Sequence, residues 1–398
     1  MTGDSIIRIA ARGDGVTADG RHVAGAVPGD VVAADGNIAH GPHHIAPVCR
    51  HFGKCGGCQL QFGDEQILAD FIRDRVANAL SAQKLVAANI LPPHLSPART
   101  RRRATLRALR PGKPVLLGYM AGGSHRLIDL GECPVLHPAL AGLIAPLRAL
   151  LSRLMAPRSD VRITLTLADQ GVDVLLSGVE ALGLEAHDAL MDFCGNHPIA
   201  RLAIDAGEGP EDRWAPEPVT VTLGGHAVAL PYGAFLQATA DGEAALVAAV
   251  RRILGDAPRV ADLFAGLGTF ALSLDGARDV LAAEAARDAA LALKASVNRA
   301  TLPIRVEHRD LYRRPLTAKE LAEFDGVILD PPRAGAEEQV RALATSSVPK
   351  IAYVSCNPAS FARDAAIFAA GGYQIGDILP VGQFRWSTHV ELVAALHR

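Results

Sequence analysis

The stretch Ile351–Phe361, IAYVSCNPASF, predicts a buried strand that ends in a tight turn. Its first four residues favour a strand, and the turn residues that follow place Cys356 at the carboxyl end of that strand. Residues 327–333, VILDPPR, end in the same way, with Asp330 directly after a second apolar strand. Ligands of open α/β sheets bind at the carboxyl ends of the strands, so a thiol and a carboxylate are expected to face one crevice.

Upstream of these two strands, residues 259–274, RVADLFAGLGTFALSL, predict a strand, a glycine turn and a helix. Gly266 and Gly268 allow the backbone to approach a ligand where a side chain would clash. Glu284 ends the next predicted strand, and a carboxylate there can accept hydrogen bonds from ribose hydroxyls. Asp310 follows a third strand, in a position suited to an adenine edge. Three successive strand ends therefore predict a nucleoside-binding site on a parallel sheet.

Cysteines form a second pattern, in which Cys49, Cys55 and Cys58 have the spacing C-x5-C-x2-C. Cys133 is the natural fourth ligand, because it precedes a proline as cluster cysteines often do. Zinc also accepts four thiolates, but its usual signature is two close pairs. Three cysteines plus a distant one therefore favour a 4Fe-4S cluster. Cys194 is interpreted as a small buried apolar residue.

The segments before and around the cysteines predict a small β-barrel, a helix and a basic run. The first 40 residues alternate short β-like runs with glycine turns, which fits a barrel. Residues 64–91 have apolar positions at helical spacing and predict an amphipathic helix. Seven cationic side chains then lie between Arg99 and Lys113, and as a group they indicate phosphate contact. A solvated strand face explains any single one of these arginines equally well.

Length and composition are those of a globular protein with room for two or three domains. The chain has 398 residues, is 49% hydrophobic and carries a net charge of −2, which argues against a generally basic nucleic-acid binder. A run of about 18 apolar residues is absent from the sequence, and the first residues lack the pattern of a signal peptide. We therefore expect a cytoplasmic protein whose six cysteines do not form disulfides.

Four motifs, DLFAGLGTF, LDPPRAG, YVSCNPASFARD and THVELVAAL, together resemble the uracil-C5 RNA methyltransferases, and the resemblance covers essentially the whole chain. It implies an S-adenosylmethionine-dependent enzyme that makes 5-methyluridine in RNA. The cysteine pattern resembles the 4Fe-4S site of the 23S rRNA branch, and the first residues resemble a short TRAM RNA-binding barrel. We therefore expect a TRAM-like β-barrel at 1–45, a central α/β RNA-binding domain with the iron-sulfur site at 46–235, and a Rossmann-like class I methyltransferase domain at 236–398. The last should contain a seven-stranded, mostly parallel sheet with helices on both faces.

The resemblance also implies roles for individual residues. Cys356 corresponds to the nucleophile that adds to carbon 6 of uracil, and Glu391 to the base that removes the proton from carbon 5. Asp330 is expected to hold the imide edge of the base, or else to fix the loop that carries it. The methyl donor or the uracil is expected to contact Gln237, Phe264, Thr269, Glu284, Asp310 and Asp330. Two residues of the glycine turn depart from the family pattern, because Ala265 and Thr269 stand where Cys and Asn are frequent.

Other classes of RNA methyltransferase would need different residues in or after the Asp-Pro-Pro loop. An m5C RNA methyltransferase would carry a second cysteine in the Asp-Pro-Pro loop, and an amino-group methyltransferase would carry an aromatic residue directly after it. This chain has Arg333 at that position. A tRNA uracil-C5 methyltransferase and a non-catalytic iron-sulfur RNA-binding protein are the alternatives to a 23S rRNA enzyme. We expect RNA as the partner, no membrane association and a monomeric enzyme.

Overall fold

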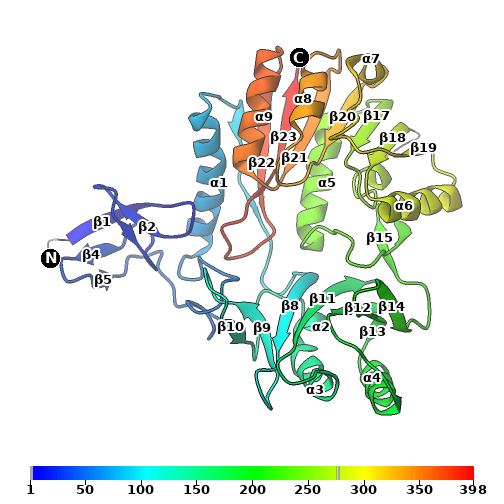
Figure 1. Cartoon of the computed structure of the whole chain (residues 1–398). Coiled ribbons are helices and arrows are strands. Elements are labelled where there is room, and N and C mark those ends of the chain that lie inside the picture. Colours follow the sequence, from blue (N-terminus) through cyan, green and yellow to red (C-terminus); the bar gives the residue numbers. More distant parts are fainter. Residues whose placement is uncertain (1–2, 275, 277) are drawn as a thin grey trace.

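The computed structural model describes residues 3–274, 276 and 278–398, and Figure 1 shows a small N-terminal sheet that projects to one side of two larger sheets. The N-terminal strands are β1 (Gly3–Ile9), β2 (Gly15–Thr17), β3 (His22–Val23), β4 (Val31–Ala33) and β5 (Ile38–Ala39). They pair antiparallel in the order β3-β2-β1-β4-β5 around a small core of Ile6, Ala26 and Val32. The predicted β structure is therefore present as an open sheet, with β3 and β5 at its edges.

The central sheet is mostly antiparallel, in the order β10-β9-β8-β11-β12-β13-β14. Its strands are β8 (Arg103–Leu109), β9 (Leu116–Met120), β10 (Leu127–Asp129), β11 (Asp160–Ala168), β12 (Gly171–Ser177), β13 (Ile199–Asp205) and β14 (Pro210–Trp214). Its helices are α2 (Pro138–Ala141), α3 (Ile144–Leu154) and α4 (Leu184–Asn196). Burial alternates along β8, so Leu106 lies in the core while Arg107 faces outward. Outside this sheet, β15 (Thr220–Leu223) and β16 (His226–Ala229) form a separate hairpin.

The C-terminal sheet has nine strands among the described residues, two more than predicted, and the seven in the order β19-β18-β17-β20-β21-β23-β22 form its mostly parallel core. The strands are β17 (Arg259–Leu263), β18 (Asp279–Glu284), β19 (Ile304–His308), β20 (Gly326–Leu329), β21 (Lys350–Ser355), β22 (Gln374–Gly382) and β23 (Glu391–His397). The helices are α5 (Ala240–Leu254), α6 (Arg287–Ala300), α7 (Ala318–Leu321), α8 (Glu337–Ala344) and α9 (Pro358–Ala370), with a 3-10 turn at Ala271–Ser273. Every residue of β20 is buried, as expected for a strand covered on both faces.

Residues 65–95, which we expected in the central domain, pack against the C-terminal sheet as helix α1 or pair with its edge as strands β6 and β7. β6 (Asn89–Ile90) and β7 (His94–Leu95) pair in parallel with β22 at the edge of the C-terminal sheet. The preceding helix α1 (Glu65–Ala82) packs its apolar side chains into the same core as β20 and β21. An amphipathic helix must bury its apolar stripe against another apolar surface, and α9 and β22 provide that surface here.

The helix termini follow the sequence signals. Asp64 caps α1, because its carboxylate accepts a hydrogen bond from the Ile67 N–H at 3.0 Å. Thr317 and Glu320 form a reciprocal capping box at α7. In the described part of the chain, none of the helices has both the length and the apolar character needed to cross a bilayer.

Candidate active site

Cys356 and Glu391 meet at the carboxyl end of the C-terminal sheet. β21 and β23 run antiparallel, and their register pairs Ser355 with Leu392. The next residues along these strands, Cys356 and Glu391, are therefore neighbours across the two strands. Glu391 is only 7% exposed, and Cys356 is half-buried. The two residues that sequence reasoning assigned to nucleophile and base thus lie side by side.

Asp330 joins this pair from β20, the strand next to β21. Burial and the negative charges of Glu391 and Glu284 raise the pKa of Asp330. Burial raises the pKa of Glu391 to about 7. Burial and the charges of Glu391 and Asp330 raise the pKa of the Cys356 thiol to about 11, and the positive charge of Arg333 opposes this shift. We call Asp330, Cys356 and Glu391 the strand-end site.

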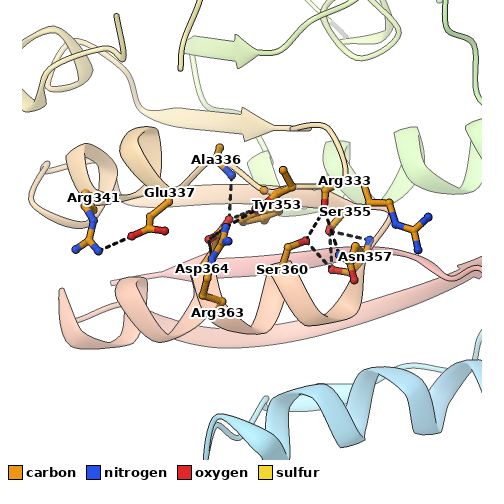
Figure 2. A network of polar contacts seen from close by, with 12 residues as sticks. Arg333, Ala336, Glu337, Arg341, Tyr353, Ser355, Asn357, Ser360, Arg363 and Asp364 are labelled. Atoms are coloured by element: carbon orange, nitrogen blue, oxygen red, sulfur yellow. Dashed lines mark hydrogen bonds and ion pairs between the residues drawn. The ribbon is translucent and has the colours of Figure 1, made fainter. Parts of the chain in front are cut away.

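The turn after Cys356 is tied to the loop that follows Asp330, residues 331–336, as Figure 2 shows. Asn357 caps α9 by accepting a hydrogen bond from the Ala359 N–H at 3.1 Å. Its side-chain amide donates to the Arg333 carbonyl at 3.1 Å, and the Ser360 hydroxyl donates to the same oxygen at 3.1 Å. These bonds fix the two strand ends relative to each other.

A buried carboxylate continues this network along α9. Asp364 accepts a hydrogen bond from the Tyr353 hydroxyl at 2.6 Å and one from the Ala336 N–H at 3.1 Å (Figure 2). The Arg363 guanidinium pairs with the other oxygen of Asp364 at 2.7 Å and also donates to the Ala334 carbonyl at 3.0 Å. The end of the 331–336 loop is therefore held by the core of the sheet.

The glycine turn after β17 is held by Glu284 at the end of β18. The Glu284 carboxylate accepts hydrogen bonds from the Gly266 N–H at 2.7 Å and from the Ala286 N–H at 2.6 Å. Gly268 has a positive φ of 90°, and a Cβ there would lie 2.5 Å from a methyl of Leu293, so glycine is required. Glu284, predicted to bind ribose, thus also shapes the turn that would receive the nucleoside.

The other predicted donor-binding residues lie near this turn. Phe264 has a positive φ of 65°, and its ring is 5.5 Å from that of Tyr312. Asp310 accepts a hydrogen bond from the Tyr312 N–H at 3.0 Å and therefore stabilises its own turn. Thr269 follows Gly268 and is half-buried. Bulky residues such as Phe264 rarely adopt a positive φ, and the exceptions cluster at functional sites.

Gln237 reaches the C-terminal sheet from the segment that precedes α5. It is buried, and its side-chain oxygen accepts a hydrogen bond from the Gln383 amide at 2.8 Å. The Gln383 oxygen in turn accepts from the Thr239 N–H at 3.3 Å. The Arg102 guanidinium donates to the Gln237 carbonyl at 3.0 Å. Gln237 is therefore fixed by the residue that follows β22 and by the central domain.

Sequence reasoning missed Asp262 and the cations near the strand-end site. Asp262 is fully buried within β17, and one of its oxygens has no partner among the described residues. Burial, together with the charges of Asp330 and Glu284, raises the pKa of Asp262 to about 7. The sequence alone shows the Asp262 carboxylate inside an apolar strand, and this pattern could have indicated a functional residue. Burial, with a smaller contribution from the positive charge of Arg333, lowers the pKa of both Arg75 and His389.

The four cysteines assigned to a cluster line one cavity of about 320 Å³, between the central domain and the β22–β23 loop (residues 383–390). Cys55 forms a β-bridge with Ala121, which fixes the cysteine segment (residues 49–62) to the end of β9. Burial raises the pKa of Cys58 to about 12, with a smaller contribution from the neighbouring thiols. In the described residues no group of three His, Cys, Asp or Glu side chains forms a ready metal site, so the cluster remains a prediction. Cys194 is buried in the central core, as expected.

Comparisons with known proteins agree with this geometry. The family model described as tRNA (uracil-5-)-methyltransferase matches residues 229–398. An uncharacterized RNA methyltransferase of Zymomonas mobilis is 52% identical over 98% of both chains. The 23S rRNA (uracil(1939)-C(5))-methyltransferase RlmD of Chromohalobacter salexigens is 35% identical over 91% of this chain and 78% of its own. The tRNA (uracil-54, C5)-methyltransferase of Pyrococcus abyssi, solved with S-adenosyl-L-homocysteine, has the same fold, with a TM-score of 0.76 at 20% identity over 99% of this chain and all of the other.

The mostly parallel sheet, its glycine turn and its acidic strand ends give the chain the fold of the class I methyltransferases. Within that class, the chain belongs to the uracil-C5 RNA methyltransferase family. The family expected from the four sequence motifs is thereby confirmed.

Proposed function

We propose that the protein transfers a methyl group to carbon 5 of a uridine in 23S rRNA, through a covalent adduct between Cys356 and carbon 6. The observation that carries this proposal is the placement of Cys356 opposite Glu391, with Asp330 on the next strand. The relative named as a 23S rRNA enzyme supports the RNA class. The target uridine must leave any base stack to reach a half-buried thiol, so a loop or a flipped base is expected.

The chemistry needs a nucleophile and a base in that order. Carbon 5 of uracil is a poor nucleophile, and addition of the Cys356 thiolate to carbon 6 makes carbon 5 electron-rich. S-adenosylmethionine supplies the methyl group when bound. Glu391 then removes the proton from carbon 5, the electron pair restores the double bond between carbons 5 and 6, and the thiolate leaves. Asp330 holds the imide edge of the uracil, and the positive charge of Arg333 favours the thiolate.

The donor is proposed to lie along the glycine turn and the neighbouring strand ends. The Cβ position of Gly266 is open among the described residues, which leaves room for a close ligand, and Glu284 already orients that turn. The side chains proposed to contact the donor or the uracil are Gln237, Phe264, Thr269, Glu284, Asp310 and Asp330. Asp262 supports the segment after the glycine turn, because its carboxylate accepts a hydrogen bond from the Ala271 N–H at 2.9 Å.

We also propose that the four cysteines hold a 4Fe-4S cluster. Four thiols that line one cavity offer the all-sulfur ligand set that such clusters use. Protein purified without oxygen should contain about four irons per chain and about four acid-labile sulfides. Replacement of Cys58 by Ser should reduce the iron content, whereas replacement of Cys194 by Ser should not. Stoichiometric zinc without iron would overturn the assignment.

Nucleoside mass spectrometry of 23S rRNA fragments and tRNA tests the proposed reaction. RNA from a strain that lacks the protein should lose 5-methyluridine from one 23S fragment, and the wild-type gene should restore it while Cys356→Ala should not. Loss of the nucleoside from tRNA instead would establish the tRNA alternative. Unchanged 5-methyluridine in both RNAs would overturn the proposed function in favour of a non-catalytic RNA-binding protein.

A further inference from the structure

The cysteine segment is bonded directly to the loop that leads into Glu391. The backbone N–H groups of Gln59 and Leu60 both donate to the Trp386 carbonyl, at 2.7 and 2.9 Å. Trp386 belongs to the β22–β23 loop, which continues through Val390 into β23. Residues far apart in the sequence are thus joined next to the cysteine cavity, whose wall includes several residues of the same loop.

The Gln59 side chain makes a second connection. Its amide nitrogen donates to the Gly56 carbonyl at 2.8 Å, and its oxygen accepts from the Thr388 N–H at 3.4 Å. Gly56 lies between Cys55 and Cys58, so one side chain links the cysteine turn to the loop. Because the nitrogen must face the Gly56 carbonyl and the oxygen must face the Thr388 N–H, the amide has a single orientation that satisfies both partners.

Trp386 needs such support because its backbone is strained. It has a positive φ of 62°, a conformation that a bulky residue keeps only where its surroundings hold it in place. Its side chain is buried in the same core as Leu60 and Val390. Only Val390 separates the exposed His389 from Glu391, so the position of the loop sets where β23 begins.

We propose that Gln59 is a positioning residue for Glu391: by holding residues 386–388, it places the base opposite Cys356. This inference rests on the proposed roles of Cys356 and Glu391, and it gives the cysteine segment a part in the second half of the reaction. Addition of the thiol and methyl transfer precede the step that needs Glu391. A displaced base therefore slows only the removal of the carbon 5 proton and the release of Cys356.

The contact itself is tested by hydrogen exchange on the full-length protein. Gln59→Met keeps the length of the side chain and removes both hydrogen bonds, and it should raise the exchange rate of peptides covering residues 386–391 about tenfold. Gln66→Met is the matched control, because Gln66 is exposed on α1 and bonds only to Asp70 among the described residues. Iron content measured on the same samples checks that the cysteine site is intact. Unchanged exchange in Gln59→Met would overturn the proposal.

The role in the reaction is tested by turnover and by adduct analysis with a methyl-labelled donor and 23S rRNA from the deletion strain. Gln59→Met should turn over about tenfold more slowly and should accumulate a methylated, denaturation-resistant protein–RNA adduct. Gln59→Glu keeps the oxygen that accepts from Thr388, but it places a second oxygen against the Gly56 carbonyl, so this variant should also turn over slowly. Slow turnover without adduct would overturn the positioning role. Absence of 5-methyluridine with the wild-type protein would overturn the proposed function as well, and hydrogen exchange distinguishes this case because it does not depend on catalysis.

Discussion

The groups around Cys356 shift the pKa of its thiol in opposite directions. Two carboxylates, Asp330 and Glu391, and burial oppose the thiolate, and Arg333 favours it. Burial and these charges together raise the pKa of the thiol, so the surroundings favour its neutral form, which is a weaker nucleophile than the thiolate. Burial also raises the pKa of the neighbouring Glu391 to about 7, which reduces the repulsion between this carboxyl group and a thiolate.

Replacement of Cys356 by Ala should abolish methylation while donor binding persists. The side chain lies at the strand-end site and not at the glycine turn, so binding of S-adenosylmethionine should change less than about threefold, while turnover falls by at least about a thousandfold. Isothermal titration and methyl incorporation into RNA measure the two effects. Turnover retained in this variant would exclude the covalent mechanism.

The rate of turnover should rise as the pH increases through about 7. A base works in its deprotonated form, and burial raises the pKa of Glu391 to about 7, so the carboxylate is mostly protonated below that pH. The pH profile of kcat measured between about pH 5.5 and 8.5 checks this. Glu391→Gln should still transfer one methyl group and should then stall as an adduct. A flat profile for the wild-type protein would contradict the assignment of the base.

At the scale of elements, α9 and the 331–336 loop behave as one unit through Asp364. Asp364→Ala should lower the free energy of unfolding by about 3 kcal/mol, because it leaves buried polar groups of Tyr353 and Ala336 without a partner. Tyr353→Phe removes one hydrogen bond and should cost about 1 kcal/mol. Denaturant titration measures both, and equal effects would show that the carboxylate is not the centre of the network.

The central strands of the C-terminal sheet, β17, β20 and β21, could be predicted because they are almost completely buried and form short apolar runs before a turn. This placed Asp330 and Cys356 correctly at strand ends. The short strands β6 and β7 could not be predicted, because two residues give no periodicity and their pairing depends on the edge of β22. The sequence pattern predicts that α1 is a helix with an apolar face, but it does not show that this face packs against the C-terminal sheet.

The basic run shows a different limit of sequence reasoning. Arg102 forms a half-buried ion pair with Glu243 at 2.5 Å, and Arg110 donates to backbone carbonyls near the end of α3. Arg107 pairs with Asp160 on β11. Several of the seven cations therefore serve the fold, and a count of charges along the sequence does not show which are already paired.

At the scale of the whole molecule, unpaired cations should set the salt dependence of RNA binding. Arg99 is exposed, and its side chain has no partner among the described residues. Arg99→Gln should lower the slope of log Kd against log salt concentration by about one, whereas Arg107→Gln should lower it less because Asp160 already neutralises that charge. Filter binding over a range of salt concentrations measures the slopes. Equal slopes in the two variants would contradict this division of the cations.

The cysteines show how much of the site depends on the complete fold. Their spacing predicted that they act together, and the structure brings all four to one cavity. That this cavity borders the loop leading to Glu391 depends on contacts between residues more than three hundred positions apart, such as Gln59 and Trp386. Local patterns identify chemically active residues, and only the tertiary structure shows which of them are connected.

The pairing of β6 and β7 with β22 also means that these strands cannot pair until most of the chain has been translated. Helix α1 and these strands leave the ribosome long before their partner strand exists. At roughly 5–20 residues per second, translation from Leu95 to Gln374 takes on the order of tens of seconds. During that time the apolar face of α1, including Phe71 and Val76, has no sheet to cover it. A nascent chain with this exposed helix is a natural client for a ribosome-associated chaperone, and the methyltransferase sheet is completed only when the last strands are made.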